Sequence, residues 1–278
     1  MTSAGKESLR NKLVLLGICS DENSTFMQGS AGAPPLIRSA LHSGSANLTS
    51  ETGMTFSHNS RVVDLGDRKV KDGRKAFMGI ETHVWNIVKK GGLPLILGGD
   101  HAITYPVLKA ISREHGEISV LHFDAHPDLY DELEGNRLSH ACPFARVMEQ
   151  GLVKRLVQVG IRTLNAHQKS QAERFGVEIH QMHSFDIGSF NPAFDEPLYL
   201  SFDMDALDPA FAPGVSHFEP GGLSVREVIS IIHKVKAPIV GADIVEYNPR
   251  NDIHNISAMV AAKLVKEIGS MILKNSVF

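Results

Sequence analysis

The chain has 278 residues, of which 42% are hydrophobic and 21% charged, and its formal net charge is -3. This length suits one α/β domain over residues 1–278, and the composition excludes a disordered chain and a basic nucleic-acid-binding surface. Two cysteines are too few for a disulfide framework and fit a reducing compartment. A thiol nucleophile at Cys142 is disfavoured, because its surroundings match no known thiol-enzyme motif.

Neither end of the chain predicts a targeting or membrane-spanning segment. Residues 1–12 are polar, and the apolar stretch 256–273 is interrupted by two lysines and a glutamate. We therefore expect a cytoplasmic protein with no membrane partner, or an organellar one if a transit peptide has been removed.

Short apolar runs alternate with helical patterns along the chain, which predicts a parallel sheet covered by helices on both faces. Segments 61–66 and 176–180 are weaker strand candidates, and 42–60 is expected to be a long loop. Ser224 and Glu227 have the spacing of a capping box at a helix start. The expected strands are 12–18, 94–99, 118–124, 156–161, 197–203 and 238–244, and the expected helices are 71–90, 105–115, 140–150, 166–175, 223–235 and 255–274.

Acidic and histidine residues gather where three of these strands end. The motifs are "GGDH" (98–101), "DAHPD" (124–128) and "SFDMD" (201–205). Each motif alone is typical of a solvated loop or turn, but carboxyl ends of parallel strands share one edge, where ligands bind. So many carboxylates at one edge would repel each other without a cation, so a metal site is the simplest interpretation.

The candidate ligands comprise two imidazoles and four carboxylates, with no thiolate. This oxygen-rich set exceeds the need of one ion and favours a pair of Mn²⁺ ions over other divalent transition metals. A bridged pair lowers the pKa of a shared water and produces a hydroxide nucleophile, which indicates hydrolysis. The candidate metal ligands are His101, Asp124, His126, Asp128, Asp203 and Asp205.

These motifs, with the long stretch "SFDMDALDPAFAPGVSHFEPGGLS" (201–224), are similar to the signatures of the ureohydrolase family of arginases and agmatinases. The similarity runs from "STFMQGSAGAPPLIR" (24–38) to "GADIVEYNPRND" (241–252) and into a final helix, and it most resembles plant arginases. The resemblance implies a three-layer αβα domain with a parallel eight-stranded sheet and two Mn²⁺ ions. It also implies hydrolysis of a guanidino group to urea and an amine, and assembly into homotrimers or homohexamers.

The resemblance also implies roles for individual residues. His140 falls where the family has a mobile proton-shuttling histidine, and Glu246 falls where a carboxylate pairs with the substrate guanidinium. That pairing suits a planar cation. Asp128 would help to move a proton to the departing amine. One ion would be held by His101, Asp124, Asp128 and Asp203, and the other by His126, Asp124, Asp203 and Asp205.

The substrate class is a small guanidino compound, and L-arginine ranks first among the candidates. Discrimination between arginine and agmatine requires donors for the α-carboxylate, for which Asn136, Ser139 and Asn165 are the candidates. Animal arginases have an Asp-rich stretch after Gly-x-Arg, where this chain has Thr163 and Asn165. Agmatinase and guanidino-acid hydrolase activities therefore stay open. A non-catalytic metal-binding protein and a single-zinc deacetylase are disfavoured, because every catalytic position is filled and six ligands exceed the need of one zinc.

Overall fold

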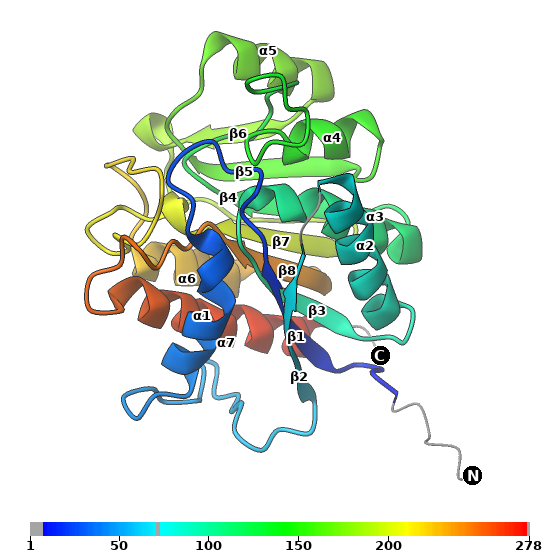
Figure 1. The fold of residues 1–278 in the computed structure, drawn as a ribbon, viewed down its shortest axis with the longest axis vertical. Coiled ribbons are helices and arrows are strands. Elements are labelled where there is room, and N and C mark those ends of the chain that lie inside the picture. The colour runs from blue at the N-terminus through cyan, green and yellow to red at the C-terminus, as the bar shows by residue number, and fades with distance from the viewer. Residues whose placement is uncertain (1–7, 71–72, 277–278) are drawn as a thin grey trace.

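The computed structural model describes residues 8–70 and 73–276. Its centre is an eight-stranded sheet in the order β2-β1-β3-β8-β7-β4-β5-β6, in which all neighbouring strands are parallel (Figure 1). The predicted fold class is confirmed, and both weaker strand candidates form the edges of the sheet. The strands are β1 (Leu13–Cys19), β2 (Val62–Lys69), β3 (Leu93–Leu97), β4 (Ser119–Phe123), β5 (Arg155–Ile161), β6 (Glu178–Gln181), β7 (Leu198–Asp203) and β8 (Ile239–Val245).

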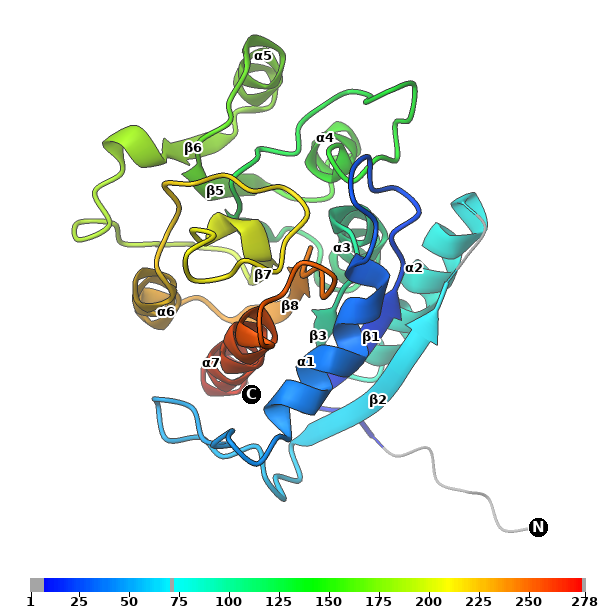
Figure 2. The same cartoon turned by 60° about the vertical axis from the view of Figure 1, so that its left-hand side comes forward.

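Helices cover both faces of the sheet, as Figures 1 and 2 show. Helices α1, α6 and α7 pack on one face, and α2, α3, α4 and α5 pack on the other. The described helices are α1 (Ala33–Leu41), α2 (Arg74–Val88), α3 (Thr104–His115), α4 (Pro143–Glu149), α5 (Ala166–Phe175), α6 (Val225–Lys234) and α7 (Ile256–Asn275).

Alternating strand residues supply the two cores. Leu13 and Leu15 of β1 join the core beneath α1 and α7, whereas Val14 and Leu16 join the core beneath α2 and α3. All four side chains are at most 3% exposed, so this strand is apolar on both faces. A continuous apolar run is the pattern expected of a strand covered on both sides.

Helix boundaries agree with the predictions except near prolines. The sequence did not predict α1, which is short and has proline in its first turn, where a missing N–H costs no hydrogen bond. The predicted helix 140–150 begins only at Pro143, so the preceding residues form a loop. The capping box at Ser224 and Glu227 is present as predicted. The predicted helix 71–90 starts at residues 71–72, outside the described residues.

The long loop expected at 42–60 is confirmed: it holds one isolated bridge between Thr49 and Thr55. Glu267 of α7 anchors this loop by accepting a hydrogen bond from the backbone N–H of Glu51 at 2.9 Å. No helix in the described part of the chain is both long and apolar enough to cross a membrane.

Candidate metal centre

Four neighbouring strands bring the three predicted motifs and Glu246 to one edge of the sheet. His101 follows β3, Glu246 follows β8, Asp203 ends β7 and Asp124 follows β4. In the sheet these strands lie in the order β3-β8-β7-β4, although their sequence order differs. The sheet topology therefore brings together residues that are more than a hundred positions apart in the chain.

The second glycine of "GGDH" allows close backbone contact at this edge. A Cβ on Gly99 would lie 1.7 Å from the carbonyl oxygen of Ser20, which also accepts a hydrogen bond from the N–H of Asp100 at 2.9 Å. The carbonyl of Gly99 accepts a hydrogen bond from the N–H of Glu246 at 2.8 Å. Gly99 thus fixes β8 and the end of β1 against the loop that carries His101.

The Nδ1 atom of His101 faces three carboxylates. It lies 3.3 Å from Oδ2 of Asp124, 3.0 Å from Oδ2 of Asp128 and 3.2 Å from Oδ2 of Asp203. None of these contacts has hydrogen-bond geometry, so this fully buried nitrogen has no hydrogen-bond partner among the described residues. One imidazole nitrogen facing three carboxylate oxygens fits the donor set of a divalent transition metal.

A second imidazole forms a similar cluster with the other oxygen of Asp124. Nδ1 of His126 lies 3.3 Å from Oδ1 of Asp124 and 3.1 Å from Oδ2 of Asp205. Asp124, His126 and Asp205 can hold an ion together, and so can His101, His122 and Asp124. Asp124 belongs to both groups, as a carboxylate that bridges two ions would.

The charges of this cluster are mutually unfavourable in a buried setting. Burial and the repulsion from neighbouring aspartates raise the pKa of Asp128 and, well above its usual range, that of Asp203. Burial also tends to raise the pKa of Asp124, but the adjacent imidazoles of His101 and His122 outweigh it and hold this pKa well below the usual range. Cations would neutralise the excess charge, so the electrostatics agree with the donor geometry.

A chain of buried hydrogen bonds orients His101 from behind. Its Nε2 atom lies 3.0 Å from the hydroxyl of Ser201, which donates to Oδ1 of Asp243 at 2.7 Å. The hydroxyls of Thr104 and Tyr199 each donate to Oδ2 of Asp243 at 2.8 Å. Since Ser201 donates to Asp243, it accepts from His101 Nε2–H, which leaves Nδ1 unprotonated toward the carboxylates.

His122, in strand β4, is fully buried behind the candidate ligands. Its Nε2 atom lies 2.9 Å from Oδ2 of Asp124, and its Nδ1 atom lies 3.0 Å from the amide nitrogen of Gln158. Since both ring nitrogens have partners, His122 supports Asp124.

His140 and Glu246 form a pair beside the cluster. Nδ1 of His140 lies 3.0 Å from Oε1 of Glu246, and its Nε2 atom lies 2.9 Å from the hydroxyl of Thr25. Oε1 of Glu246 also accepts the backbone N–H of His101 at 2.8 Å. Burial lowers the pKa of His140, but the carboxylate of Glu246 outweighs this and raises the pKa to about 9.

Two of the site residues adopt a left-handed backbone conformation. Asp128 has φ 51° and Glu246 has φ 60°. This conformation costs a non-glycine residue about 1–2 kcal/mol, and such strain gathers at functional sites. It turns both carboxylates toward the same cavity, whose lining includes them.

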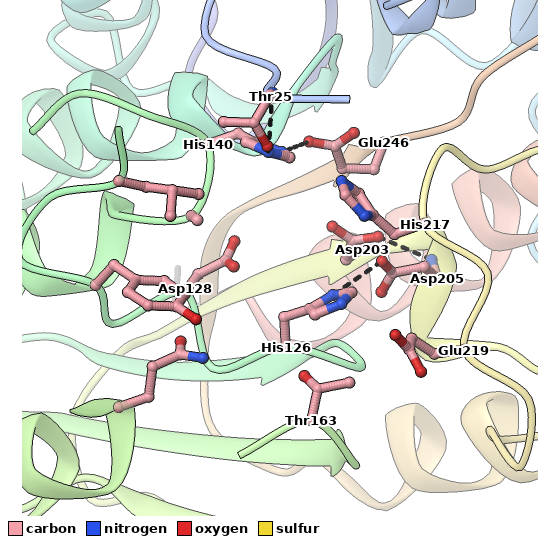
Figure 3. A pocket seen from close by; sticks show the side chains of 14 residues that line it. Thr25, His126, Asp128, His140, Thr163, Asp203, Asp205, His217, Glu219 and Glu246 are labelled. Atoms are coloured by element: carbon pink, nitrogen blue, oxygen red, sulfur yellow. Dashed lines mark hydrogen bonds and ion pairs between the residues drawn. The ribbon is translucent and has the colours of Figure 1, made fainter. Parts of the chain in front are cut away.

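The cluster forms the floor of a cavity of about 210 Å³ (Figure 3). His101 and Asp124 are fully buried beneath it, whereas the other four predicted ligands, His140 and Glu246 line it. The lining residues are Thr25, His126, Asp128, Tyr130, Leu133, His140, Ala141, Thr163, Gln168, Asp203, Asp205, His217, Glu219 and Glu246.

The three residues predicted to bind the substrate carboxylate do not line this cavity. The Asn136 side chain accepts the N–H of Leu138 at 2.9 Å, and Oγ of Ser139 accepts the N–H of Ala141 at 3.4 Å. Asn165 caps α5 through its side-chain oxygen and donates to the hydroxyl of Tyr130. The side chains of all three residues thus make hydrogen bonds within the protein. Their role in substrate binding stays a prediction.

Several residues that line the cavity were not predicted from the sequence. Thr25 lies in the loop after β1, Tyr130 and Gln168 belong to no motif, and Glu219 directly precedes the Pro-Gly-Gly run at 220–222. One signal was available: His217 and Glu219 are two positions apart, as are residues that share one side of an extended chain.

The fold and the site define an α/β protein with a candidate two-ion centre beside a carboxylate suited to a guanidinium. The model of the Arginase family matches residues 11–270. The chain is 44% identical to "Arginase 1, mitochondrial" of Arabidopsis thaliana, over 94% of this chain and 81% of that protein. It is 35% identical to the mitochondrial guanidino acid hydrolase of Homo sapiens, over 91% of this chain and 76% of that protein.

The solved structure of arginase from Medicago truncatula has the same fold, with a TM-score of 0.90 and 41% sequence identity. The match covers 94% of this chain and 87% of that one. The chain therefore belongs to the arginase family, and the predicted resemblance to the ureohydrolases is confirmed.

Proposed function

We propose that the protein hydrolyses the guanidino group of L-arginine to give L-ornithine and urea. The observation that carries this proposal is the single cavity that joins Glu246 to the His and Asp cluster. A carboxylate beside a candidate metal pair can hold a planar guanidinium over a nucleophile. The plant arginases among the relatives support arginine as the substrate.

We propose two Mn²⁺ ions per chain as the cofactor. The unpaired Nδ1 of His101 and the oxygen-rich donor set support this choice, since no thiolate contributes. When bound, the ions would supply an activated water and stabilise negative charge on the reacting carbon's substituents. His101, Asp124, Asp128 and Asp203 would hold one ion, and His126, Asp124, Asp203 and Asp205 the other.

The remaining residues would position the substrate and move protons. Glu246 would accept two hydrogen bonds from the guanidinium, which must replace the contact with His140. Once released from Glu246, His140 would carry protons between the cavity and water, with Thr25 holding its other ring nitrogen. Asp128 would pass a proton to the departing amine nitrogen, since it lines the cavity at the cluster.

Agmatine and guanidino acids are the alternative substrates, and the residue types that line the cavity favour testing them. None of the residues that line the cavity is a lysine or an arginine. Apart from the imidazoles, the donors that an α-carboxylate would meet are neutral, such as Tyr130, Thr163 and Gln168. The human guanidino acid hydrolase among the relatives also supports a test of this class.

The test is urea release by the Mn²⁺-loaded protein with L-arginine, agmatine and 4-guanidinobutanoate, compared at slightly alkaline pH. The proposal predicts the highest kcat/KM for L-arginine, with ornithine formed in equal amount to urea. A preference for agmatine or for 4-guanidinobutanoate would replace arginine with that substrate. Absence of urea from all three would refute the guanidino hydrolase function.

We also propose that the chain self-associates and that it works in the cytoplasm or in an organelle. Exposed large apolar side chains at Phe26, Phe211 and Phe218, on the loops around the cavity, support self-association. Analytical ultracentrifugation should give a trimer or hexamer, and a monomer at micromolar concentration would contradict this.

The name of the Arabidopsis relative includes "mitochondrial", so imaging of a tagged full-length protein should include mitochondria.

A further inference from the structure

Glu219 is the one acid in the cavity lining that has no partner in the described part of the chain. Its side chain is half-buried, and its carboxylate makes no hydrogen bond or ion pair with residues 8–70 or 73–276. The other lining acids lie against imidazoles: Asp128 faces His101, and Glu246 faces His140. A carboxylate with no ion-pair partner inside a cavity is a suitable partner for a cationic ligand.

The backbone around Glu219 is held firmly, so its direction is set by the fold. His217 and Glu219 line the cavity, whereas Phe218 between them is 48% exposed. Nε of Arg162 donates to the carbonyl oxygen of Glu219 at 2.8 Å, and Nη2 of Arg162 donates to the carbonyl of Asp205 at 2.7 Å. Arg162 therefore ties this segment to the loop that carries the candidate metal ligands.

Glu219 and Glu246 lie at separate ends of the site. Figure 3 shows Glu246 and His140 at the top, His126 between, and Glu219 with Thr163 at the bottom. The cavity thus offers one carboxylate to the guanidinium and a second carboxylate to the distant end of the same molecule. Glu219 gives that distant end an acidic group, and no lysine or arginine lines the cavity.

We propose that Glu219 binds the ammonium group at the end of the substrate opposite the guanidinium. This inference rests on the proposed guanidino hydrolase function and names the feature that selects its substrates. L-Arginine and agmatine both have such an ammonium group and are accepted. A guanidino acid with a carboxylate and no ammonium is repelled by Glu219.

The test uses Glu219→Gln, which keeps the shape of the side chain and removes its charge. KM for L-arginine and for agmatine rises about tenfold to a hundredfold, because a charge-assisted hydrogen bond becomes a neutral one. The kcat changes by less than about threefold, since Glu219 does not touch the reacting carbon. The kcat/KM for 4-guanidinobutanoate stays constant or rises, because a repulsion is removed.

The matched control is Glu132→Gln, which removes the same charge from an exposed residue beside the lining residue Leu133. It leaves all three KM values unchanged. Metal content by plasma emission spectrometry and the melting temperature are measured for each variant, to establish that the site remains intact.

Two results would overturn the inference while the proposed function stands. In the first, the wild-type protein hydrolyses L-arginine, and the Glu219→Gln variant has the same KM for L-arginine as the wild type. The second is an equal loss of kcat/KM for all three substrates, which would assign Glu219 a general structural role. A wild-type protein that releases no urea would refute the proposed function itself, and the inference with it.

Discussion

Replacement of Asp243 by asparagine should weaken metal binding at a distance from the ligands. Asp243 is fully buried and accepts hydroxyl hydrogen bonds from Ser201, Thr104 and Tyr199. An asparagine oxygen can still accept two of these bonds, but its NH₂ group cannot accept the third from Ser201. Ser201 would then accept from the amide and donate to Nε2 of His101, which places the ring proton on Nδ1, toward the carboxylates.

The structure gives two magnitudes for this variant. Exchange of hydrogen bonds to a buried carboxylate for hydrogen bonds to a neutral amide should lower the free energy of unfolding by about 1.5–3 kcal/mol. The unfavourable His101 tautomer should reduce affinity for the ion at Asp128 about tenfold to a hundredfold, which is about 1.4–2.7 kcal/mol. The second ion, near His126, should be affected less, because His126 has no contact with Ser201 or Asp243 in the described structure.

The assay is calorimetric titration of the metal-free protein with Mn²⁺, together with urea denaturation. Thr104→Val is the matched control, because it removes one hydrogen bond to Asp243 without contacting the chain from Ser201 to His101. It should lower stability and leave both metal affinities unchanged. Asp243→Asn with wild-type affinity for both ions would refute the proposed orientation of His101.

Three further predictions concern the site. His140→Asn should retain both ions but lose most turnover, and an unchanged kcat would remove His140 from the mechanism. Asp124→Ala should lose metal stoichiometry, whereas two retained ions by metal analysis would refute a bridging Asp124. In the metal-free protein, Glu246 raises the pKa of His140 to about 9 despite burial, whereas an unfolded histidine titrates near about 6.5. The stabilisation from this pair is therefore complete below pH of about 6.5 and lost as pH rises through about 9, so the difference in urea midpoint between wild type and His140→Asn should shrink over that range.

The strands and the candidate metal ligands could be predicted from the sequence, because apolar runs and short motifs are local features. Apolar runs such as that of β1 are covered on both faces, and Asp124 and Asp203 directly follow or end such runs. The order of the strands was not predictable from these patterns. That β7 and β8 lie between β3 and β4 depends on crossover connections, which no short motif encodes.

The substrate-binding residues were harder to predict, because residue type does not reveal a side chain's partner. Asn165 could serve a ligand, but it caps α5 and bonds to Tyr130. Glu219 could not be predicted from its position before the Pro-Gly-Gly run, because the direction of its side chain depends on contacts of its backbone with Arg162. Helix α1 was missed for a local reason, since the prolines of its first turn also occur in loops.

The central claim is that two ions and Glu246 act on one guanidino substrate in one cavity. The measurement that tests it most directly is the initial rate of urea release from L-arginine as Mn²⁺ is added stepwise to the metal-free protein. The account predicts that the rate keeps rising until two equivalents of Mn²⁺ per chain are bound. It also predicts that a Glu246→Gln variant binds both ions but releases little urea. Full activity at one equivalent, or full activity without Glu246, would contradict it.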